Sequence, residues 1–556
     1  MKSLLIQLTF IFAFANLLAQ SNTVGVIQNN PDSYVGYTFF SPFNSTNVYL
    51  VDNCGRLVNQ WERGTLPGLS AYFLENGLML RTYKVSPEGP FTSASNAGGL
   101  ELVDWDNNVV WFYEFNSSEF LSHHDAVMMP NGNLLVLTWE LVYTDEIVEL
   151  GRDPNEIFSG GFMWSEKILE IKPIGNNDSE VVWQWEIKNH YIQDFDSTKS
   201  NFGIVSEHPE LFDINLPKLN SNNSNSTRDW NHFNAIDYNP ELDQILISTR
   251  NSDEFWIIDH STTTEEAVSH VGGTYGRGGD ILYRWGNANA YDRASTNQQK
   301  LYGQHGINWI TEGEDTGAIL VYNNGNGRPG TDYSTVEAIF PPQSESGFYI
   351  IPETDPIGPS TADWIYDGDT NGPFFSPYLS NAQRLPNGNT FINAGSPGHI
   401  YEINKAEEIV WEYIIPLSGN SQVPQGSNAN NNSSFRAYKY GVDYPGFDGI
   451  NLVAGELLEI NNDPDPCDLV STKDINVDQF NINHIYDGAL KNLKIYFQSQ
   501  QDLVLEIFDL QGRRILKRDL IGGENSIDLS MIEKSMYIFT ISTSRKLLKT
   551  EKIIIH

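Results

Sequence analysis

Residues 125–138, DAVMMPNGNLLVLT, contain two apolar runs separated by Pro130-Asn131-Gly132. Asn-Gly between apolar runs is the strongest short signal for a β-hairpin, because both residues tolerate the positive φ angles of a tight turn. Similar pairs of apolar runs around a turn recur along the chain, which predicts an all-β body built of repeated units. The other copies are residues 71–83 (AYFLENGLMLRTY), 234–249 (NAIDYNPELDQILIST), 308–323 (NWITEGEDTGAILVYN) and 381–395 (NAQRLPNGNTFINAG).

A second repeated unit alternates with these hairpins and is a short strand that carries a tryptophan. Six such strands at irregular spacing predict a six-bladed β-propeller with long insertions. A pair of β-sandwiches is the alternative, but it explains the repeated hairpins less well. The tryptophans of this unit are Trp61, Trp111, Trp185, Trp285, Trp364 and Trp411.

Composition limits the classes of function. The 556 residues exceed one ordinary domain, and 40% hydrophobic residues exclude a disordered chain. The formal net charge of −37 would repel phosphates, so nucleic acids and anionic membranes are not expected as partners. Two cysteines are too few for a disulfide scaffold or a four-cysteine zinc site.

The two ends of the chain differ from the body. Lys2 precedes an apolar run over residues 4–18 that is too short to span a bilayer, so residues 1–20 are predicted to be a cleaved secretory signal peptide rather than a retained anchor. No other stretch approaches the length of a transmembrane segment. The propeller is expected over 21–460, a turn-rich linker over 461–475, and a small antiparallel β-sandwich over 476–556, where the strong acidity of the body ends.

Three of the five hairpins begin with a histidine. His124, His232 and His305 occupy this position, and Ser380 occupies it in the fifth hairpin. The innermost strand of each propeller blade begins at the central channel, so equivalent positions on different blades are expected to converge. The alternative is that each histidine is a separate structural residue.

Arg250 follows the apolar run 244–249 in the same predicted blade as His232. A guanidinium at the end of a buried strand needs an anionic partner. Together with the amide of Asn234, these residues predict an anion-binding cluster and not a hydrolytic metal site, because no carboxylates are obviously placed among them. Three histidines can nevertheless hold zinc, so a metal stays an alternative.

From about residue 36 to 450 the sequence resembles the bacterial arylsulfate sulfotransferases. The resemblance rests on stretches in matching order, including GYTFFSP (36–42), HHDAVMMPNGNLLVL (123–137), the stretch 229–261, LYGQHGINWI (301–310) and FRAYKYGVDYPGF (435–447). It implies a six-bladed propeller that moves a sulfuryl group from a phenyl sulfate to a phenol, with no cofactor and no nucleotide-activated sulfate.

The resemblance also assigns roles to residues. The family's transiently sulfated histidine falls on His305, and its other site residues fall on His124, His232, Asn234 and Arg250. His123 is the alternative to His124, although the register of the hairpin favours His124. The competing functions are a non-catalytic propeller that binds a ligand or protein, an aryl sulfatase-like hydrolase, and a metal-dependent lyase or hydrolase.

The tail resembles the C-terminal sorting domain of the type IX secretion system of Bacteroidetes. The stretches 503–520 (LVLEIFDLQGRRILKRDL), 526–530 (SIDLS), 535–541 (SMYIFTI) and 551–556 (EKIIIH) carry this resemblance. One departure is Ser535-Met536 before Tyr537, where the family usually has glycine. The resemblance implies the type IX secretion machinery as a partner, with release or attachment at the cell surface; a generic carbohydrate-binding or adhesion sandwich is the alternative.

The two cysteines lie at opposite ends of the predicted propeller. Cys54 is on the first blade, and Cys467 follows the last propeller strand. A propeller closes by bringing its first and last segments together, and an exported protein can keep a disulfide. The sequence therefore predicts a Cys54–Cys467 disulfide, with two unrelated thiols as the alternative.

Overall fold

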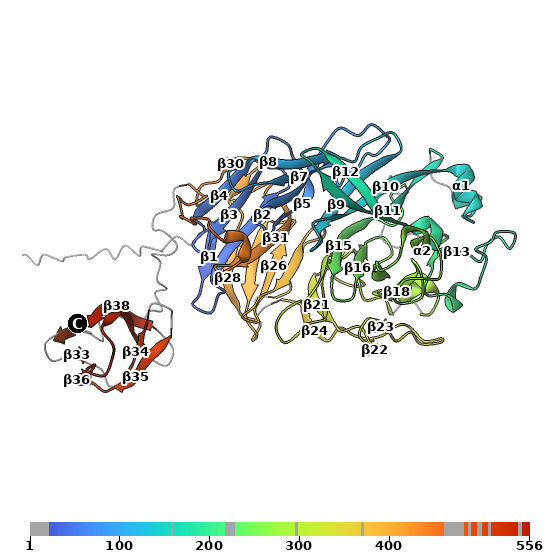
Figure 1. Cartoon of the computed structure of the whole chain (residues 1–556). Helices are drawn as coiled ribbons and strands as arrows, with labels where there is room; N and C mark the ends of the chain where they lie inside the picture. The colour runs from blue at the N-terminus through green and yellow to red at the C-terminus, as the bar shows by residue number, and fades with distance from the viewer. Residues whose placement is uncertain are drawn as a thin grey trace, which may run out of the picture. The chain divides into compact units, whose positions relative to one another are not determined.

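A computed structural model describes residues 22–156, 160–216, 228–294, 298–368, 372–460, 483–487, 491–497, 503–509, 513–542 and 547–555 (Figure 1). The predicted signal peptide and linker lie outside these residues, as does Cys467. The chain divides into two compact units, Met1–Pro466 and Cys467–His556. The first unit is called the body below.

The hairpin predicted from residues 125–138 is confirmed. Strands β9 (Phe120–Met128) and β10 (Leu134–Tyr143) pair antiparallel around the turn. Gly132 has a φ of 84°, and its N–H donates to the carbonyl of Met129 at 2.9 Å. A residue with a Cβ would be strained at this φ, which explains why glycine follows Asn131 in the sequence.

Two antiparallel groups of four strands form one 8-stranded sheet. They meet at a single parallel bridge between Leu69 and His124. The first group is β5 (Pro67–Phe73), β6 (Met79–Lys84), β7 (Gly98–Val103) and β8 (Val109–Glu114), and the second is β9, β10, β11 (Phe162–Ile174) and β12 (Asp178–Glu186).

Two further antiparallel sheets of four strands follow along the chain. One is β15 (Phe233–Asn239), β16 (Gln244–Thr249), β17 (Glu254–Asp259) and β18 (Ile281–Trp285). The other is β19 (His305–Trp309), β20 (Ile319–Asn323), β21 (Thr335–Ile339) and β24 (Trp364–Tyr366).

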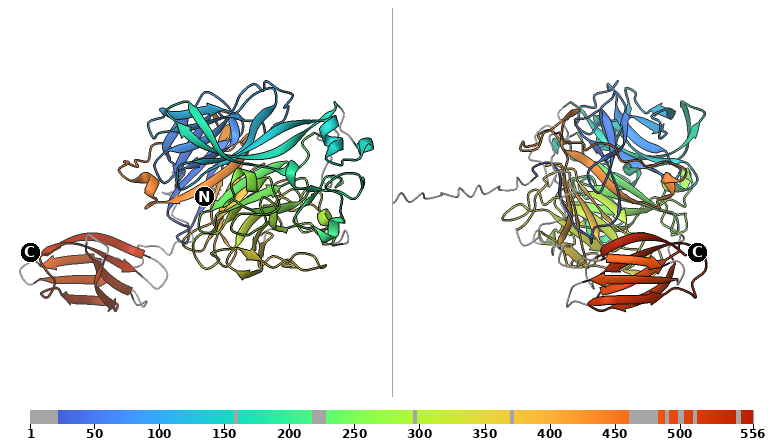
Figure 2. Two further views of the ribbon diagram at one scale, coloured as in Figure 1. Left: turned by 45° about the vertical axis from the view of Figure 1, so that its right-hand side comes forward. Right: turned by 90° about the vertical axis from the view of Figure 1, so that its left-hand side faces the viewer.

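Two sheets combine strands from both ends of the body, so that blue and orange strands lie side by side in Figures 1 and 2. In one of them β31 pairs with β2 along its length, and in the other β1 pairs with β28. These sheets are β31 (Ser434–Gly441), β2 (Gly36–Pro42), β3 (Asn47–Asp52) and β4 (Leu57–Glu62), and β1 (Gly25–Asn29), β28 (Ile409–Ile414), β27 (His399–Ile403), β26 (Thr390–Ala394) and β25 (Asn381–Arg384).

One strand from each group contacts the corresponding strand of the next group. The contacts run β5–β9, β9–β15, β15–β19, β19–β25, β25–β31 and β31–β5, so they return to their starting point. The fold of the body is therefore propeller-like, and the residues at the beginning of these inner strands are brought close to one another.

The repeated tryptophans link each group to the next. The indole N–H of Trp61 donates to the carbonyl of Asp104 at 2.9 Å, and that of Trp411 donates to the carbonyl of Asn53 at 2.9 Å. Among the described residues, five of the six tryptophans make such a bond, and Trp364 instead lies under the guanidinium of Arg384. The other three bonds join Trp111 to Asp178, Trp185 to Gly279 and Trp285 to Pro359.

Short elements connect the sheets. No helix among the described residues is long and apolar enough to cross a membrane. These elements are α1 (Thr144–Glu149), α2 (Thr264–Ala267), the 3-10 turns η1 (Pro154–Glu156), η2 (Ile187–His190), η3 (Val205–Glu207), η4 (Ala288–Tyr291) and η6 (Pro445–Phe447), and the short strands β13 (Tyr191–Ile192), β14 (Phe212–Asp213), β22 (Gln343–Glu345), β23 (Phe348–Tyr349), β29 (Leu417–Ser418) and β30 (Ser421–Gln422).

The C-terminal unit contains two antiparallel sheets, of three and four strands, around one apolar cluster. Alternate residues of its strands are buried, as in residues 503–507, where Leu503, Leu505 and Ile507 point into the cluster. The strands are β32 (Asn483–Asp487), β33 (Asn492–Phe497), β34 (Leu503–Phe508), β35 (Arg514–Leu520), β36 (Gly523–Asp528), β37 (Ser535–Ser542) and β38 (Leu547–Ile555).

Candidate active site

The three histidines that begin hairpins lie on neighbouring inner strands. His124 is on β9, His232 directly precedes β15, and His305 is the first residue of β19. The rings of His124 and His232 are 4.6 Å apart between centroids. The ring of Phe435, on β31, lies 6.2 Å from that of His124 and 6.3 Å from that of His305. Residues from four groups of strands thus gather at one place.

The backbone at these positions has an uncommon conformation. His124 has a φ of 48° and His232 a φ of 56°, and Ser380, at the equivalent position before β25, has a φ of 89°. A left-handed backbone at a residue other than glycine costs about 1–3 kcal/mol and clusters at functional sites. The strand register shifts next to the histidines, for example between His305 and Asn308. Such irregularities change the direction in which the side chains at the start of a strand point.

His305 is held so that one ring nitrogen remains available. Its Nδ1 lies 2.7 Å from Oδ1 of Asn324 and 3.0 Å from the carbonyl of Gly303. The amide nitrogen of Asn324 donates to the carbonyls of Ser376 and Leu379, so its oxygen must face the histidine. Nδ1 therefore carries the proton, and Nε2 presents a lone pair.

The surroundings keep this imidazole neutral. His305 is 4% exposed, and burial lowers its pKa well below the ordinary value, with a further contribution from the charge of Arg250. A neutral imidazole with a free Nε2 is the form that can attack an electrophile.

Arg250 follows β16 directly and is half-buried. Among the described residues, its guanidinium makes one hydrogen bond, a long contact of 3.4 Å from Nη1 to Oδ1 of Asn251. Burial lowers the pKa of Arg250, and the nearby carboxylates of Asp253 and Asp229 oppose this shift. A guanidinium with uncommitted donors is suited to grip a tetrahedral anion.

A chain of hydrogen bonds distinguishes His123 from His124. Nε2 of His123 lies 3.0 Å from Glu166, and its N–H donates a hydrogen bond to this carboxylate. Nδ1 of His123 therefore accepts from Nδ1 of His124 at 2.8 Å, and Nε2 of His124 is left with a lone pair. His123 also stacks on Trp139, with ring centroids 4.1 Å apart, so it is enclosed between protein groups.

His124 and His232 are both arranged to exchange protons. Burial lowers the pKa of His124 well below its ordinary value, and electrostatic repulsion from the neighbouring His232 lowers it further. Nδ1 of His232 lies 2.5 Å from Oδ2 of Asp229, which fixes its ring. Such carboxylate–histidine pairs orient an imidazole for acid–base work.

Asn234 is completely buried beside these histidines. Its amide nitrogen donates to the carbonyl of Gln304 at 2.8 Å, whereas its Oδ1 has no partner among the described residues. A buried acceptor without a partner is costly, so this oxygen is suited to accept a hydrogen bond from a bound group.

Arg436 on β31 was not predicted from the sequence. Its Nη2 donates to Oδ2 of Asp125 at 3.2 Å and to the carbonyl of Asn234 at 3.3 Å, and its Nη1 donates to the carbonyl of Ser380. Tyr72 donates to the other oxygen of Asp125 at 2.6 Å. Arg436 therefore links Asp125, Asn234 and Ser380, which lie on or directly before three inner strands, in one hydrogen-bonded network.

Glu166 and Asn324, which set the tautomers of the histidines, were also not predicted. Each comes from a strand or loop that does not begin a hairpin, so the repeat pattern could not reveal them. Arg436 lies in the stretch 435–447, which carries part of the family resemblance. Its place directly after the apolar Phe435 was the signal that the sequence offered for it.

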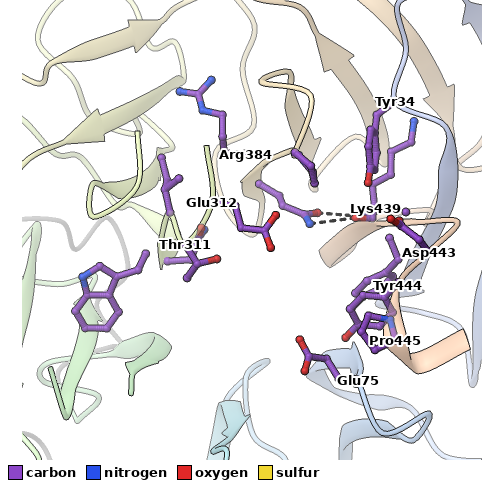
Figure 3. A pocket seen from close by; sticks show the side chains of 16 residues that line it. Tyr34, Glu75, Thr311, Glu312, Arg384, Lys439, Asp443, Tyr444 and Pro445 are labelled. Atoms are coloured by element: carbon purple, nitrogen blue, oxygen red, sulfur yellow. Dashed lines mark hydrogen bonds between the residues drawn. The ribbon is translucent and has the colours of Figure 1, made fainter. Parts of the chain in front are cut away.

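A cavity of about 450 Å³ lies at the opposite ends of the same strands, because β19, β25 and β31 reach it with their last residues (Figure 3). The carboxylates of Glu75, Glu312 and Asp443 line it. The two basic residues of its lining, Arg384 and Lys439, are paired with other carboxylates. Its carboxylates make this cavity poorly suited to an anionic ligand, in contrast to the histidine end of the strands, where Arg250 lies.

A family model for arylsulfotransferase (ASST) matches residues 49–436, which is more than half of the chain. The chain belongs to the arylsulfotransferase family. The matched region contains the three hairpin histidines, Asn234, Arg250 and Arg436. A model for the secretion system C-terminal sorting domain matches residues 489–556, so the chain carries a type IX sorting domain, which indicates secretion and surface attachment.

Several solved structures are similar to this chain at low identity. A protein of unknown function from Bacteroides caccae is 12% identical, with 68% of this chain and 93% of that chain covered and a TM-score of 0.36. A streptogramin B lyase is 10% identical, with coverages of 76% and 95% and a TM-score of 0.32. A putative 6-phosphogluconolactonase from Bacteroides fragilis is 10% identical, with coverages of 74% and 99% and a TM-score of 0.34. No curated protein matches the sequence.

Proposed function

We propose that the protein is an arylsulfate sulfotransferase that works by a ping-pong mechanism through a sulfohistidine at His305. The observation that carries this proposal is the bond from Nδ1 of His305 to Asn324, which leaves Nε2 as a neutral nucleophile facing a group of anion-binding residues. The substrates are a phenolic sulfate donor and a phenolic acceptor, and no nucleotide sulfate takes part.

In the first half-reaction the lone pair on Nε2 of His305 forms a bond to sulfur. The bond from sulfur to the aryl oxygen breaks, and its electron pair leaves with the phenolate. Arg250 grips two sulfuryl oxygens through its planar fork, and His232 holds the third. As in phosphoryl transfer, most of the catalysis comes from positioning and from stabilising charge on the group in flight.

In the second half-reaction the lone pair on Nε2 of His124 takes the proton of the acceptor phenol, which leaves His124 as an imidazolium. In the first half-reaction of the next cycle His124 returns this proton to the departing phenolate and becomes neutral again. The chain from His124 through His123 to Glu166 supports this role, because the carboxylate stabilises a positive charge that forms on His124. His123 is therefore the supporting residue. Oδ1 of Asn234 accepts a hydrogen bond from the phenol formed in the first half-reaction, after His124 has given up its proton.

A direct test uses the purified chain and a chromogenic aryl sulfate, with and without a second phenol. We expect phenol release to be faster when the acceptor is present and to need no nucleotide sulfate, because the acceptor discharges the sulfohistidine. Release that is unchanged by acceptor would indicate a sulfatase. No release from any of several donors would favour a binding propeller.

The predicted architecture is part of this proposal. We take the groups of four strands in the body as the six blades of a propeller and the two C-terminal sheets as a sandwich. The tail would direct export through the type IX machinery after a signal peptide at residues 1–20 has been removed.

The Cys54–Cys467 disulfide also stays a prediction. Cys54 lies in the turn after β3, next to Asn53, whose carbonyl accepts from Trp411 of the last group of strands. We expect thiol titration of the unfolded, unreduced protein to find no free thiol, and reduction to lower its stability. Two titratable thiols without reductant would contradict the pairing.

A further inference from the structure

A second cluster of histidines lies outside the candidate active site. His190 ends η2, and His270 and Asp280 lie in the connection between β17 and β18. Nδ1 of His190 and Nδ1 of His270 are each 2.8 Å from the same oxygen of Asp280. We propose that these three residues bind a zinc ion that fastens this connection to the end of β12.

The other nitrogen of His190 shows which form of the ring is present. Nε2 of His190 lies 2.9 Å from the carbonyl oxygen of Ala267, which can only accept, so Nε2 carries a proton. In the neutral ring Nδ1 then presents a lone pair to a carboxylate oxygen, so their 2.8 Å contact requires either a second proton on the ring or a metal ion bound to both atoms. A histidine that donates one N–H to a backbone carbonyl and turns its other nitrogen to a metal is the usual arrangement of a protein ligand.

The three ligand atoms are already close together. They lie within 4.8 Å of one another, and both nitrogens are 2.8 Å from the Asp280 oxygen. Donors held about 2.0–2.2 Å from a tetrahedral zinc lie about 3.3–3.5 Å apart, so shifts of less than about 1 Å would admit the ion. Two imidazoles and a carboxylate are typical zinc ligands. The side chain of His190 is 1% exposed and that of Asp280 is 6% exposed, whereas His270 is 59% exposed. The fourth coordination position therefore faces solvent and would hold water.

The backbone around the cluster is tightly fixed. A Cβ on Gly279 would come within 2.1 Å of the carbonyl of Ala267 and 2.6 Å of Nε2 of His190, so only glycine fits there. The carbonyl of Gly279 accepts from the indole of Trp185, whose ring stacks on His190. Asp280 and His190 are thus positioned by the rigid junction between two groups of strands, and His270 completes the set from the exposed loop.

The competing explanation needs no metal. His190 could be a buried imidazolium paired with Asp280, with His270 as a surface neighbour. This explanation and the zinc site differ in what the exposed histidine does: a metal needs the ring of His270, whereas the ion pair does not. His270→Ala is therefore the informative variant, and its exposure makes it compatible with folding.

The test uses the full chain, treated with chelator and returned to metal-free buffer, and titrates ZnCl₂ against a zinc-binding dye at pH 7.5. His208→Ala is the matched control, because His208 is also exposed and pairs with a carboxylate, Glu210, at 2.9 Å. The histidines of the candidate active site can also bind zinc and raise the measured stoichiometry. The quantity to compare is therefore the difference in zinc binding between variants measured under the same conditions.

We expect wild type and His208→Ala to bind one zinc more than His270→Ala, or to bind it about 100-fold more tightly. Zinc should also raise the melting temperature of wild type and not that of His270→Ala. A crystal soaked in zinc should show anomalous scattering between the three ligand atoms. Equal zinc binding by His270→Ala and wild type, or no tight binding by either, would overturn the proposal and leave the ion pair.

Discussion

Replacing His305 by alanine is expected to abolish both half-reactions, with a loss of turnover of at least about 10⁴-fold, because no other group can form the covalent intermediate. In donor-treated wild type, mass spectrometry should find an added sulfuryl group on the peptide that carries His305. The same treatment of His305→Ala should leave every histidine peptide unmodified.

His399→Ala is the matched control for this experiment. His399 lies on β27 in the same unit, where it pairs with Glu412 at 2.8 Å and packs against Tyr401, and neither partner belongs to the candidate active site. We expect its turnover to stay near that of wild type. Near-normal turnover by His305→Ala, or a sulfuryl group on another histidine, would refute the assignment of the nucleophile.

Changing Arg250 to lysine should lower kcat/KM by about 10²–10³-fold although the positive charge is kept. Lysine offers one point charge where arginine offers a planar pair of donors, and the pair is matched to two oxygens of the sulfuryl group. Because charge on those oxygens changes during transfer, we expect kcat to fall in both half-reactions. Steady-state kinetics over donor and acceptor concentrations would measure this.

Arg384→Lys serves as the control for the same substitution elsewhere. Arg384 lies in the acidic cavity at the opposite ends of the strands, where it pairs with Asp315 at 3.0 Å. We expect this variant to keep its activity. If Arg250→Lys were as active as Arg384→Lys, the proposal that Arg250 binds two oxygens of the sulfuryl group through its paired donors would be refuted.

The sequence was sufficient to predict the hairpins and the approach of the histidines. Asn131-Gly132 specifies a turn by its local backbone preferences. Trp61 and four of its five counterparts repeat because their indoles donate to the neighbouring group of strands. These signals are local or periodic, so one sequence reveals them. The gathering of His124 and His232 followed from their equivalent places in the repeat.

The residues that decide the chemistry of the histidines could not be found in this way. Asn324 sets the tautomer of His305 from the end of β20, and Glu166 reaches His123 from β11. Arg436 lies 311 residues from its partner Asp125. Such contacts depend on how the groups of strands pack against one another, and no spacing rule within the sequence records that packing.

The pairing of β31 with β2 also determines when this protein can finish folding. Strand β2 has β3 as a partner on one side, but its other edge stays open until residues 434–441 have been synthesised. An open strand edge is a template for wrong pairing with another chain. Because the closing contact joins segments so distant in sequence, closure should be a slow, late step, and a chain shortened before residue 434 should aggregate rather than form a smaller stable ring.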